Sequence, residues 1–250
     1  MTLFTKSKFY YGHTVDINNR NIDFQEGSTL FVATLRPRGY TLQGFATEIN
    51  RAMNLVSENN YFVSVNRATR QIIIQGDEPF SLLPEGANIG TSALPLAGFV
   101  SNTPADTTQT GGASGKEFIP MFPLQDYTDF SIDKEAVDAV VNESASGRVE
   151  SVFFGRSNFM TCNIRYQTNK KLRSTFNPDG VAELIDFMDY ITTKAEIEFM
   201  PNAGDPETFT PCLLESTSRS SIGVGYRLTE SDGIPGYLDS GRLVFRERVL

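Results

Sequence analysis

The order of apolar and polar residues predicts β-structure at the start of the chain. Residues 8–23 mix aromatic residues with Asn and Asp, which indicates short irregular strands and turns. The segment Ser28–Leu35 (STLFVATL) is rich in β-branched and aromatic residues and therefore favours a strand. Residues 36–39 (RPRG) are typical of a turn, so we expect this strand to end at residue 35.

The next segment has the periodicity of an amphipathic helix that begins after Thr41. The hydroxyl of Thr41 can cap the helix by accepting a hydrogen bond from a first-turn N–H. Gln43, Glu48 and Arg51 fall on the polar face and are expected to face water. The apolar residues at helical spacing, which we expect to be buried, are Leu42, Phe45, Ala46, Ile49 and Met53.

Two β-rich runs after the helix predict a hairpin. They are Tyr61–Val65 and Gln71–Gln75, joined through NRATR, in which Asn66 favours a turn. The helix is expected to pack its apolar face on this hairpin, because a hairpin by itself is marginally stable in water. Strand, helix and hairpin together predict a small α+β module in residues 1–100.

A change of composition follows the module. Ser101–Ser114 (SNTPADTTQTGGAS) is small and polar, and such a segment buries too little apolar surface to form a core. We therefore predict a linker over residues 101–115 and a second, β-rich domain over residues 116–250.

The second domain begins with one predicted helix and two predicted strands. Residues 132–143 carry Ala and Val at helical spacing, which predicts a helix, although β-branched valines disfavour one. Residues 148–156 (RVESVFFGR) and 159–169 (FMTCNIRYQTN) are predicted to be adjacent strands.

A second helix is predicted over residues 178–193. Asn177 and Pro178 supply an N-cap and a first-turn proline. Its expected apolar face comprises Val181, Leu184, Ile185, Met188 and Ile191. Four strands separated by turn-rich segments are predicted after it, at residues 194–200, 208–217, 222–230 and 241–249. We therefore expect an α+β fold, a mainly antiparallel β-sheet or sandwich with covering helices, in two domains.

Composition narrows the function classes. The chain has 250 residues, 40% hydrophobic content and a formal net charge of −8, as expected of a soluble globular protein. The negative charge argues against specific nucleic-acid binding, since such binding depends on Lys and Arg. We see no apolar run of membrane-spanning length and no signal-peptide pattern, so we expect no membrane association and synthesis in the cytoplasm.

The residues that could support catalysis are few. His13 is the single histidine, and its aromatic surroundings favour a structural role over a catalytic one. Cys162 and Cys212 are more consistent with buried thiols than with a disulfide, which the sequence leaves open. The segment Thr110–Glu117 (TGGASGKE) resembles a phosphate-binding loop, but Thr110 and Glu117 replace the required glycine and hydroxyl. We predict no metal, no cofactor and no catalytic residue.

Two other function classes remain open. Exposed aromatic side chains at Tyr10, Tyr11 or Tyr237 would suit a carbohydrate- or receptor-binding module. A carboxylate pair could cleave a sugar, but the acids are expected to be solvated surface groups with ordinary pKa values.

Several segments resemble, in order, structural proteins of tailed-phage virions. In the N-terminal module these are KFYYGHTVDINNRNIDFQEG (8–27), Gly39-Tyr40-Thr41 before the helix, the hairpin, LLPEGAN (82–88) and LAGF (96–99). Residues 180–217, GVGYRLTE (223–230) and GRLVFRERV (241–249) resemble the helix-then-sheet pattern of tail-tube-related proteins, including distal-tail and baseplate-hub rings.

This resemblance implies a ring of identical subunits, commonly six, whose β-sheets join around a lumen through which DNA can pass. The partners it implies are other copies of the chain, the tail tube protein and tail-tip or baseplate hub proteins. Its implied location is the virion tail, after assembly in the host cytoplasm. A head–tail connector or tail-completion protein is the alternative within the same class.

Overall fold

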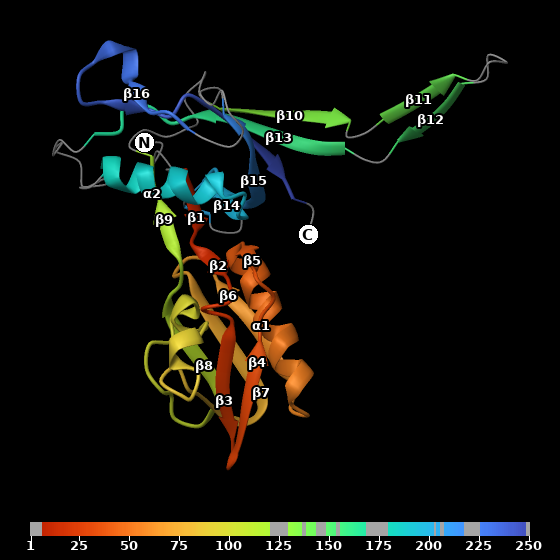
Figure 1. Ribbon diagram of the computed structural model, residues 1–250, viewed down its shortest axis with the longest axis vertical. Helices are drawn as coiled ribbons and strands as arrows, with labels where there is room; N and C mark the ends of the chain where they lie inside the picture. The colour runs from red at the N-terminus through yellow and green to blue at the C-terminus, as the bar shows by residue number, and fades with distance from the viewer. Residues whose placement is uncertain are drawn as a thin grey trace. The chain divides into compact units, whose positions relative to one another are not determined.

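The computed structural model describes residues 7–120, 130–136, 139–143, 149–153, 156–168, 180–202, 204–205, 208–217 and 226–248 (Figure 1). The chain divides into two compact units. The N-terminal unit comprises Lys8–Phe118 together with Ala195–Phe209, and the C-terminal unit comprises the remainder. Every ladder between described strands of one unit is antiparallel, which confirms a mixed α+β fold built mainly from antiparallel sheet.

The N-terminal unit contains one long helix and most of the short strands. Its elements are β1 (Lys8–Tyr11), β2 (His13–Val15), β3 (Asn21–Glu26), β4 (Thr29–Thr34), β5 (Arg38–Tyr40), α1 (Leu42–Val56), β6 (Tyr61–Asn66), β7 (Gln71–Leu82), η1 (Ile89–Thr91), η2 (Leu94–Ala97), β8 (Asp106–Ala113), β9 (Lys116–Phe118) and β14 (Ile197–Met200). The main sheet has the order β4-β3-β7-β6, and β8 also pairs with β7. β2 pairs with β5, and β1 pairs with both β14 and β9.

Helix α1 forms where its periodicity predicts it. The Thr41 hydroxyl accepts a hydrogen bond from the Gly44 N–H at 2.9 Å, and all five predicted apolar residues are buried. The expectation that Glu48 faces water was wrong, since this side chain is buried. Its carboxylate accepts bonds from the Arg36 N–H at 2.9 Å and from the Arg51 Nε at 2.9 Å. Burial alone would raise the pKa of Glu48, but these donors outweigh it and hold the pKa below its usual value.

Helix α1 contacts the two outer strands of the main sheet, β6 and β4. Toward β6, Asn54 accepts a hydrogen bond from the Tyr61 N–H at 2.7 Å and donates to the Tyr61 carbonyl at 2.9 Å. Asn50 accepts a bond from the Val63 N–H at 3.2 Å. Toward β4, Arg51 donates to the carbonyl of Thr34 at 3.4 Å. The helix thus supplies hydrogen bonds along the outer edge of β6 that a further strand would otherwise make, and one bond at the end of β4.

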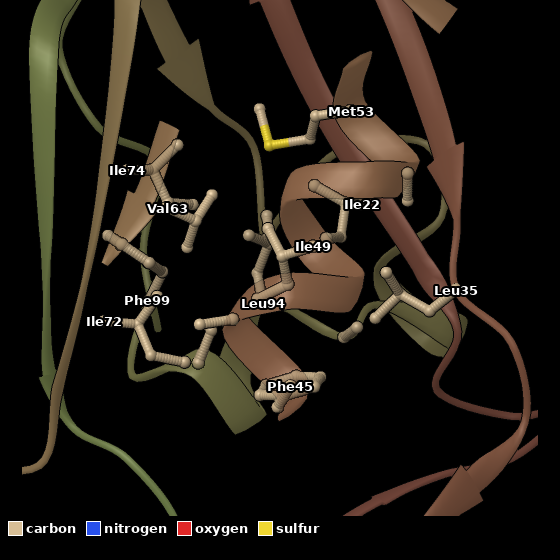
Figure 2. Packing of buried hydrophobic residues seen from close by; sticks show 14 of the residues in the cluster. Ile22, Leu35, Phe45, Ile49, Met53, Val63, Ile72, Ile74, Leu94 and Phe99 are labelled. Carbon is tan, nitrogen blue, oxygen red and sulfur yellow. The ribbon is translucent and has the colours of Figure 1, made fainter. Parts of the chain in front are cut away.

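The enclosed core is apolar (Figure 2). The buried face of α1 meets β-branched side chains of β6 and β7, and η2 contributes Leu94 from a further side. Aromatic side chains add edge-to-face contacts around Tyr61. The centroid of its ring lies 5.0 Å from the ring centroid of Phe80 and 5.6 Å from that of Phe24. Both strands of the predicted hairpin, β6 and β7, therefore pack against the helix as expected.

The segment predicted to be a linker is largely a strand. β8 pairs with β7, so that Thr110 lies opposite Ile73 and Thr108 lies opposite Gln75. Threonine suits a strand, and Gly111 allows a close approach because a Cβ there would lie 2.4 Å from the Ala97 carbonyl oxygen. The expectation of a linker in this segment was wrong because a strand can be held by main-chain pairing without an apolar face.

The C-terminal unit is mainly β-structure. Its described elements are β10 (Phe130–Ala136), β11 (Ala139–Glu143), β12 (Val149–Phe153), β13 (Arg156–Asn163), α2 (Gly180–Thr192), β15 (Thr210–Thr217), β16 (Thr229–Glu230), η3 (Ser231–Gly233), β17 (Leu238–Asp239) and β18 (Arg242–Glu247). Neighbouring strands of its sheet follow the order β10-β13-β18-β15. β11 pairs with β12, and β16 pairs with β17.

Two predictions in this unit were wrong. The expected helix over residues 132–143 consists of β10 and β11, because β-branched residues and pairing with later strands outweigh a helical spacing of small and apolar residues. The strands expected to be adjacent, β12 and β13, pair with other partners: β12 with β11, and β13 with β10 and β18.

Helix α2 confirms the second predicted helix over its described residues. Leu184, Met188 and Ile191 are buried as expected, and Phe187 joins them. Ile185 is exposed. The predicted N-cap at Asn177 and Pro178 lies outside the described residues. Of the segment 222–230, predicted to be a strand, the described part pairs at Thr229–Glu230.

We predict that Asn54→Ala lowers the free energy of unfolding by about 1–2 kcal/mol, because it leaves the N–H and carbonyl of Tyr61 without their partner. Urea denaturation measures this. Thr47→Ala is the matched control, since Thr47 is exposed on α1, its hydroxyl bonds within the helix, and Thr and Asn have similar helix propensities. Equal stability of the two variants would contradict the edge-capping role.

Candidate interaction surfaces

His13 is paired with Ser114, although the sequence placed Ser114 in a linker. The His13 Nε2 lies 2.7 Å from the Ser114 Oγ, and that hydroxyl donates to the carbonyl of Leu96 at 2.7 Å. Because the hydroxyl hydrogen is used on Leu96, His13 must be the donor, which is opposite to a histidine that activates a serine. Burial, and to a lesser extent the charge of Arg70, lowers the pKa of His13 to about 4. The pair therefore acts as a neutral structural link.

Gly115 makes the close approach to His13 possible. A Cβ at Gly115 would lie 2.4 Å from the His13 Cε1, and the backbone φ of +64° there also favours glycine. The segment that resembles a phosphate-binding loop, Thr110–Glu117, thus contains the end of β8, the turn at Gly115 and the start of β9. Its glycines serve packing between strands and turns.

The two cysteines are buried thiols that form no disulfide, which confirms the preferred interpretation of the sequence. Cys162 lies on β13 opposite Leu243 of β18, and Cys212 lies on β15 opposite Glu247 of β18. One strand and an offset of four residues separate them, so the Cα atoms are well beyond the roughly 7 Å limit of a disulfide.

The aromatic residues considered for sugar binding are mostly buried. Tyr10 and Tyr11 are buried, and the Tyr10 hydroxyl donates to the carbonyl of Arg67 at 3.0 Å. Tyr237 is half-buried. No group of three or more His, Cys, Asp or Glu side chains within the described ranges could hold a metal ion. In those same residues, no helix is long and apolar enough to cross a membrane.

A buried carboxylate contradicts the expectation that the acids are all solvated. Glu198 of β14 is 0% exposed and accepts a hydrogen bond from the Gln43 N–H, in the first turn of α1, at 3.1 Å. Burial raises the pKa of Glu198 above its usual value, against the opposing effects of Gln43 and of Arg67, whose Nε lies 3.7 Å from the carboxylate. The signal in the sequence was AEIEFM (195–200), a strand in which two glutamates alternate with apolar residues.

Arg67 connects this buried acid to a pocket of about 420 Å³. Its guanidinium carbon lies 3.6 Å from the centroid of the Phe209 ring, and its Nη2 donates to the Gln43 Oε1 at 3.3 Å. The pocket lies between α1 and β6, and its lining includes Gln43, Thr47, Asn50, Phe62, Val65 and Arg67. Phe62 is 64% exposed at this surface.

The pocket lies where the capping of β6 by α1 ends. Tyr61 and Val63 direct their N–H groups to Asn54 and Asn50, so the two-residue alternation of a strand directs the Val65 N–H to the same edge. A short open piece of strand edge beside an exposed aromatic ring is suited to contact with another polypeptide.

The C-terminal unit presents a second candidate surface. β10 and β13 form a seven-residue ladder, and the chain between them carries the five-residue ladder of β11 and β12 (Figure 1). Among the described strands, β11 and β12 pair only with each other, and β10 pairs only with β13. Within the described part of the chain, β10, β11 and β12 thus each pair with a single strand.

No protein-family model matches the chain, and no curated protein is similar enough to it to count as a match.

We predict that the protein becomes less stable as the pH decreases from 7 to 4, because His13 is protonated more readily in the unfolded chain. The pKa of His13 is about 4 in the folded protein and about 6.5 in the unfolded chain, so the unfolded state binds the proton more readily between these values. His13→Gln keeps a donor for Ser114. Relative to this variant, the free energy of unfolding of the wild type should decrease by about 3 kcal/mol between pH 7 and pH 4. Urea unfolding across this range measures the difference, and parallel pH profiles would contradict it.

The pH dependence of stability that Glu198 contributes is expected to have the opposite sign to that of His13. Its pKa is raised in the folded protein, so ionisation costs stability as pH rises from the usual glutamate range through the raised pKa. Compared with Glu198→Gln, the wild type should therefore become less stable as pH increases over this interval. The same unfolding series tests this, with Glu85→Gln, an exposed acid of the same unit, as control. A stability difference between the wild type and Glu198→Gln that stays constant with pH would contradict this prediction.

Proposed function

We propose that this protein is a non-enzymatic structural component of a phage tail, which forms a ring at the distal tail or baseplate hub. In this proposal the C-terminal unit forms the ring, and the N-terminal unit decorates it. The ring joins the tail tube to tip proteins, with six copies as the expected number. The sequence resemblance motivates the proposal, and the architecture of the C-terminal unit supports it.

The observation that carries the proposal is the hairpin of β10–β13. A two-stranded ladder such as β11–β12 is marginally stable in water without a third strand or a packing partner. Among the described strands β10 pairs with β13 alone, and a strand edge without a strand partner is a template for pairing with another chain. A closed ring of identical subunits supplies neighbours to such edges and leaves no unpaired end.

The chemistry of the described residues is consistent with an assembly role. His13 donates to Ser114 and is neutral at pH 7, so this pair lacks the proton acceptor that nucleophilic catalysis needs. The burial of Tyr10 and Tyr11 removes two of the three aromatic residues that a carbohydrate-binding role would use. A head–tail connector remains the second candidate, since a ring subunit with open edges suits either end of a tail.

We predict that the purified protein forms closed rings, and that the hairpin is required for them. Mass photometry and negative-stain electron microscopy give the copy number and shape. Replacing residues 137–155 with an Asn-Gly turn, which joins the paired Ala136 and Arg156, should yield a folded monomer, because the β10–β13 ladder remains but the β11–β12 ladder is lost.

The control for this deletion is Ile234→Ser, a change at an exposed apolar residue of the same unit. It should leave the ring intact, and circular dichroism should show that both variants are folded. A full-length protein that stays monomeric and has no place in a tail particle, as judged by antibody labelling of virions, would refute the proposed function. Labelling at the head-proximal end would favour the connector.

A further inference from the structure

An exposed apolar patch, here called the α1–β4 patch, lies away from the pocket and comprises Leu30, Val32 and Leu55. These side chains are 67%, 46% and 74% exposed. Leu30 and Val32 alternate with Phe31 and Ala33, which face the core, so they share the outer face of β4. Monomeric proteins rarely leave several large apolar side chains together on the surface without a role.

Leu55 belongs to this patch because of its place on the helix. Glu48, Arg51 and Leu55 follow one another at helical spacing along one side of α1. Glu48 bonds to the Arg36 N–H and Arg51 to the Thr34 carbonyl, so this side faces β4 and runs antiparallel to it. The next turn of α1 advances about 6 Å, the length of two strand residues, from which we infer that Leu55 lies near Val32.

The two ends of the patch carry opposite charge. At one end, Arg20, Arg36 and Arg38 are exposed and outnumber the exposed acid Asp16. The Leu35 N–H bonds to the Arg20 carbonyl at 2.8 Å, which places Arg20 at this end of β4.

The other end is acidic. The Glu26 carboxylate accepts bonds from the Ser57 hydroxyl at 2.5 Å and the Tyr61 hydroxyl at 2.6 Å, and Glu58 follows Ser57. Asn59 donates to the Glu78 carbonyl at 3.4 Å, which brings Asp77 and Glu78 to the same end. The segments that build it, residues 21–35, 52–66 and 71–88, contain no Lys or Arg.

We propose that the α1–β4 patch pairs the N-terminal units of two copies of this chain about a two-fold axis through Val32. Such a rotation places the apolar centre on itself and the basic end of each copy over the acidic end of the other. A surface whose charges are complementary to its own rotated copy is the requirement for an isologous contact. The occupant is therefore a second copy of this chain.

The pairing is expected to be weak between free subunits. Three side chains and their charged rim cover a small part of a standard interface of about 1,600 Å². An assembly that holds many copies together raises the effective concentration and allows such a contact to form. The strength of the pairing thus rests on the proposed ring, whereas its geometry does not.

Disulfide trapping in the full-length chain tests the geometry. Val32 lies at the proposed axis, so Val32→Cys should form a dimer with its own counterpart under mild oxidation. Val100→Cys is the matched control, since Val100 is a valine of the same unit and is 75% exposed. Cys162 and Cys212 are buried and should not react. We expect trapping about tenfold faster at position 32 than at position 100, and equal rates would overturn the pairing.

Charge reversal tests the orientation. In the Val32→Cys protein, Arg20→Glu or Glu58→Lys alone should slow trapping about tenfold, and the two together should restore it, because the double variant exchanges the charges across the axis. Arg227→Glu, at an exposed position of the C-terminal unit, should change nothing. Failure of the double variant to recover would contradict the two-fold arrangement.

Mass photometry of the same variants separates the two proposals. Rings that persist while Val32→Cys is trapped no faster than Val100→Cys would overturn the pairing alone. Trapping at position 32 in a protein that never forms rings would support the pairing and contradict the proposed function.

Discussion

The fold of the N-terminal unit depends on helix α1 lying against both outer strands of one sheet. The strand order β4-β3-β7-β6 leaves main-chain groups at two edges, and an unpaired buried N–H or carbonyl costs about 1–3 kcal/mol. Asn50 and Asn54 serve β6, while Glu48 and Arg51 serve β4 and the turn after it. The apolar face between these two polar sides fills the core (Figure 2). One helix therefore covers the outer edge of β6, contacts the end of β4 and supplies much of the packing of the sheet.

The need to cap the strand edges also determines which surface residues near α1 are polar. Where the asparagines of α1 end, β6 continues beside a pocket lined by Phe62 and Arg67. One helical turn beyond Arg51, which contacts β4, the exposed Leu55 follows. Positions that cap an edge must be polar, and positions beyond the reach of that edge are free to serve other contacts. The candidate interaction surfaces of this unit therefore lie at the limits of the edge capping, while in the C-terminal unit β10, β11 and β12 each pair with a single described strand.

The buried polar groups show why the candidate site was largely beyond sequence reasoning. Glu198 bonds to an N–H that is 155 residues earlier in the chain, and His13 bonds to a serine 101 residues later. The sequence identified His13 as the single histidine and favoured a structural role, which its donor geometry supports. It placed Ser114 in a linker and treated all acids as solvated, because neither burial nor a distant partner leaves a local signal. The alternating glutamates in AEIEFM were the one local sign that a carboxylate enters a packed strand.

By itself the sequence determined what depends on short-range spacing: the α1 helix with its cap at Thr41 and its apolar face, the β6–β7 hairpin, the described part of α2, the late strands and the mixed, mainly antiparallel fold class. Only the tertiary structure decided that residues 106–113 pair as β8, that residues 130–136 and 139–143 are strands, and that Ala195–Phe209 packs in the N-terminal unit. Helical periodicity and capping depend on residues a few positions apart, so they can be predicted from the local sequence. Strand pairing and the burial of charge depend on residues far apart in the chain. These residues interact only once the fold has brought them together, so the local sequence does not indicate the interaction.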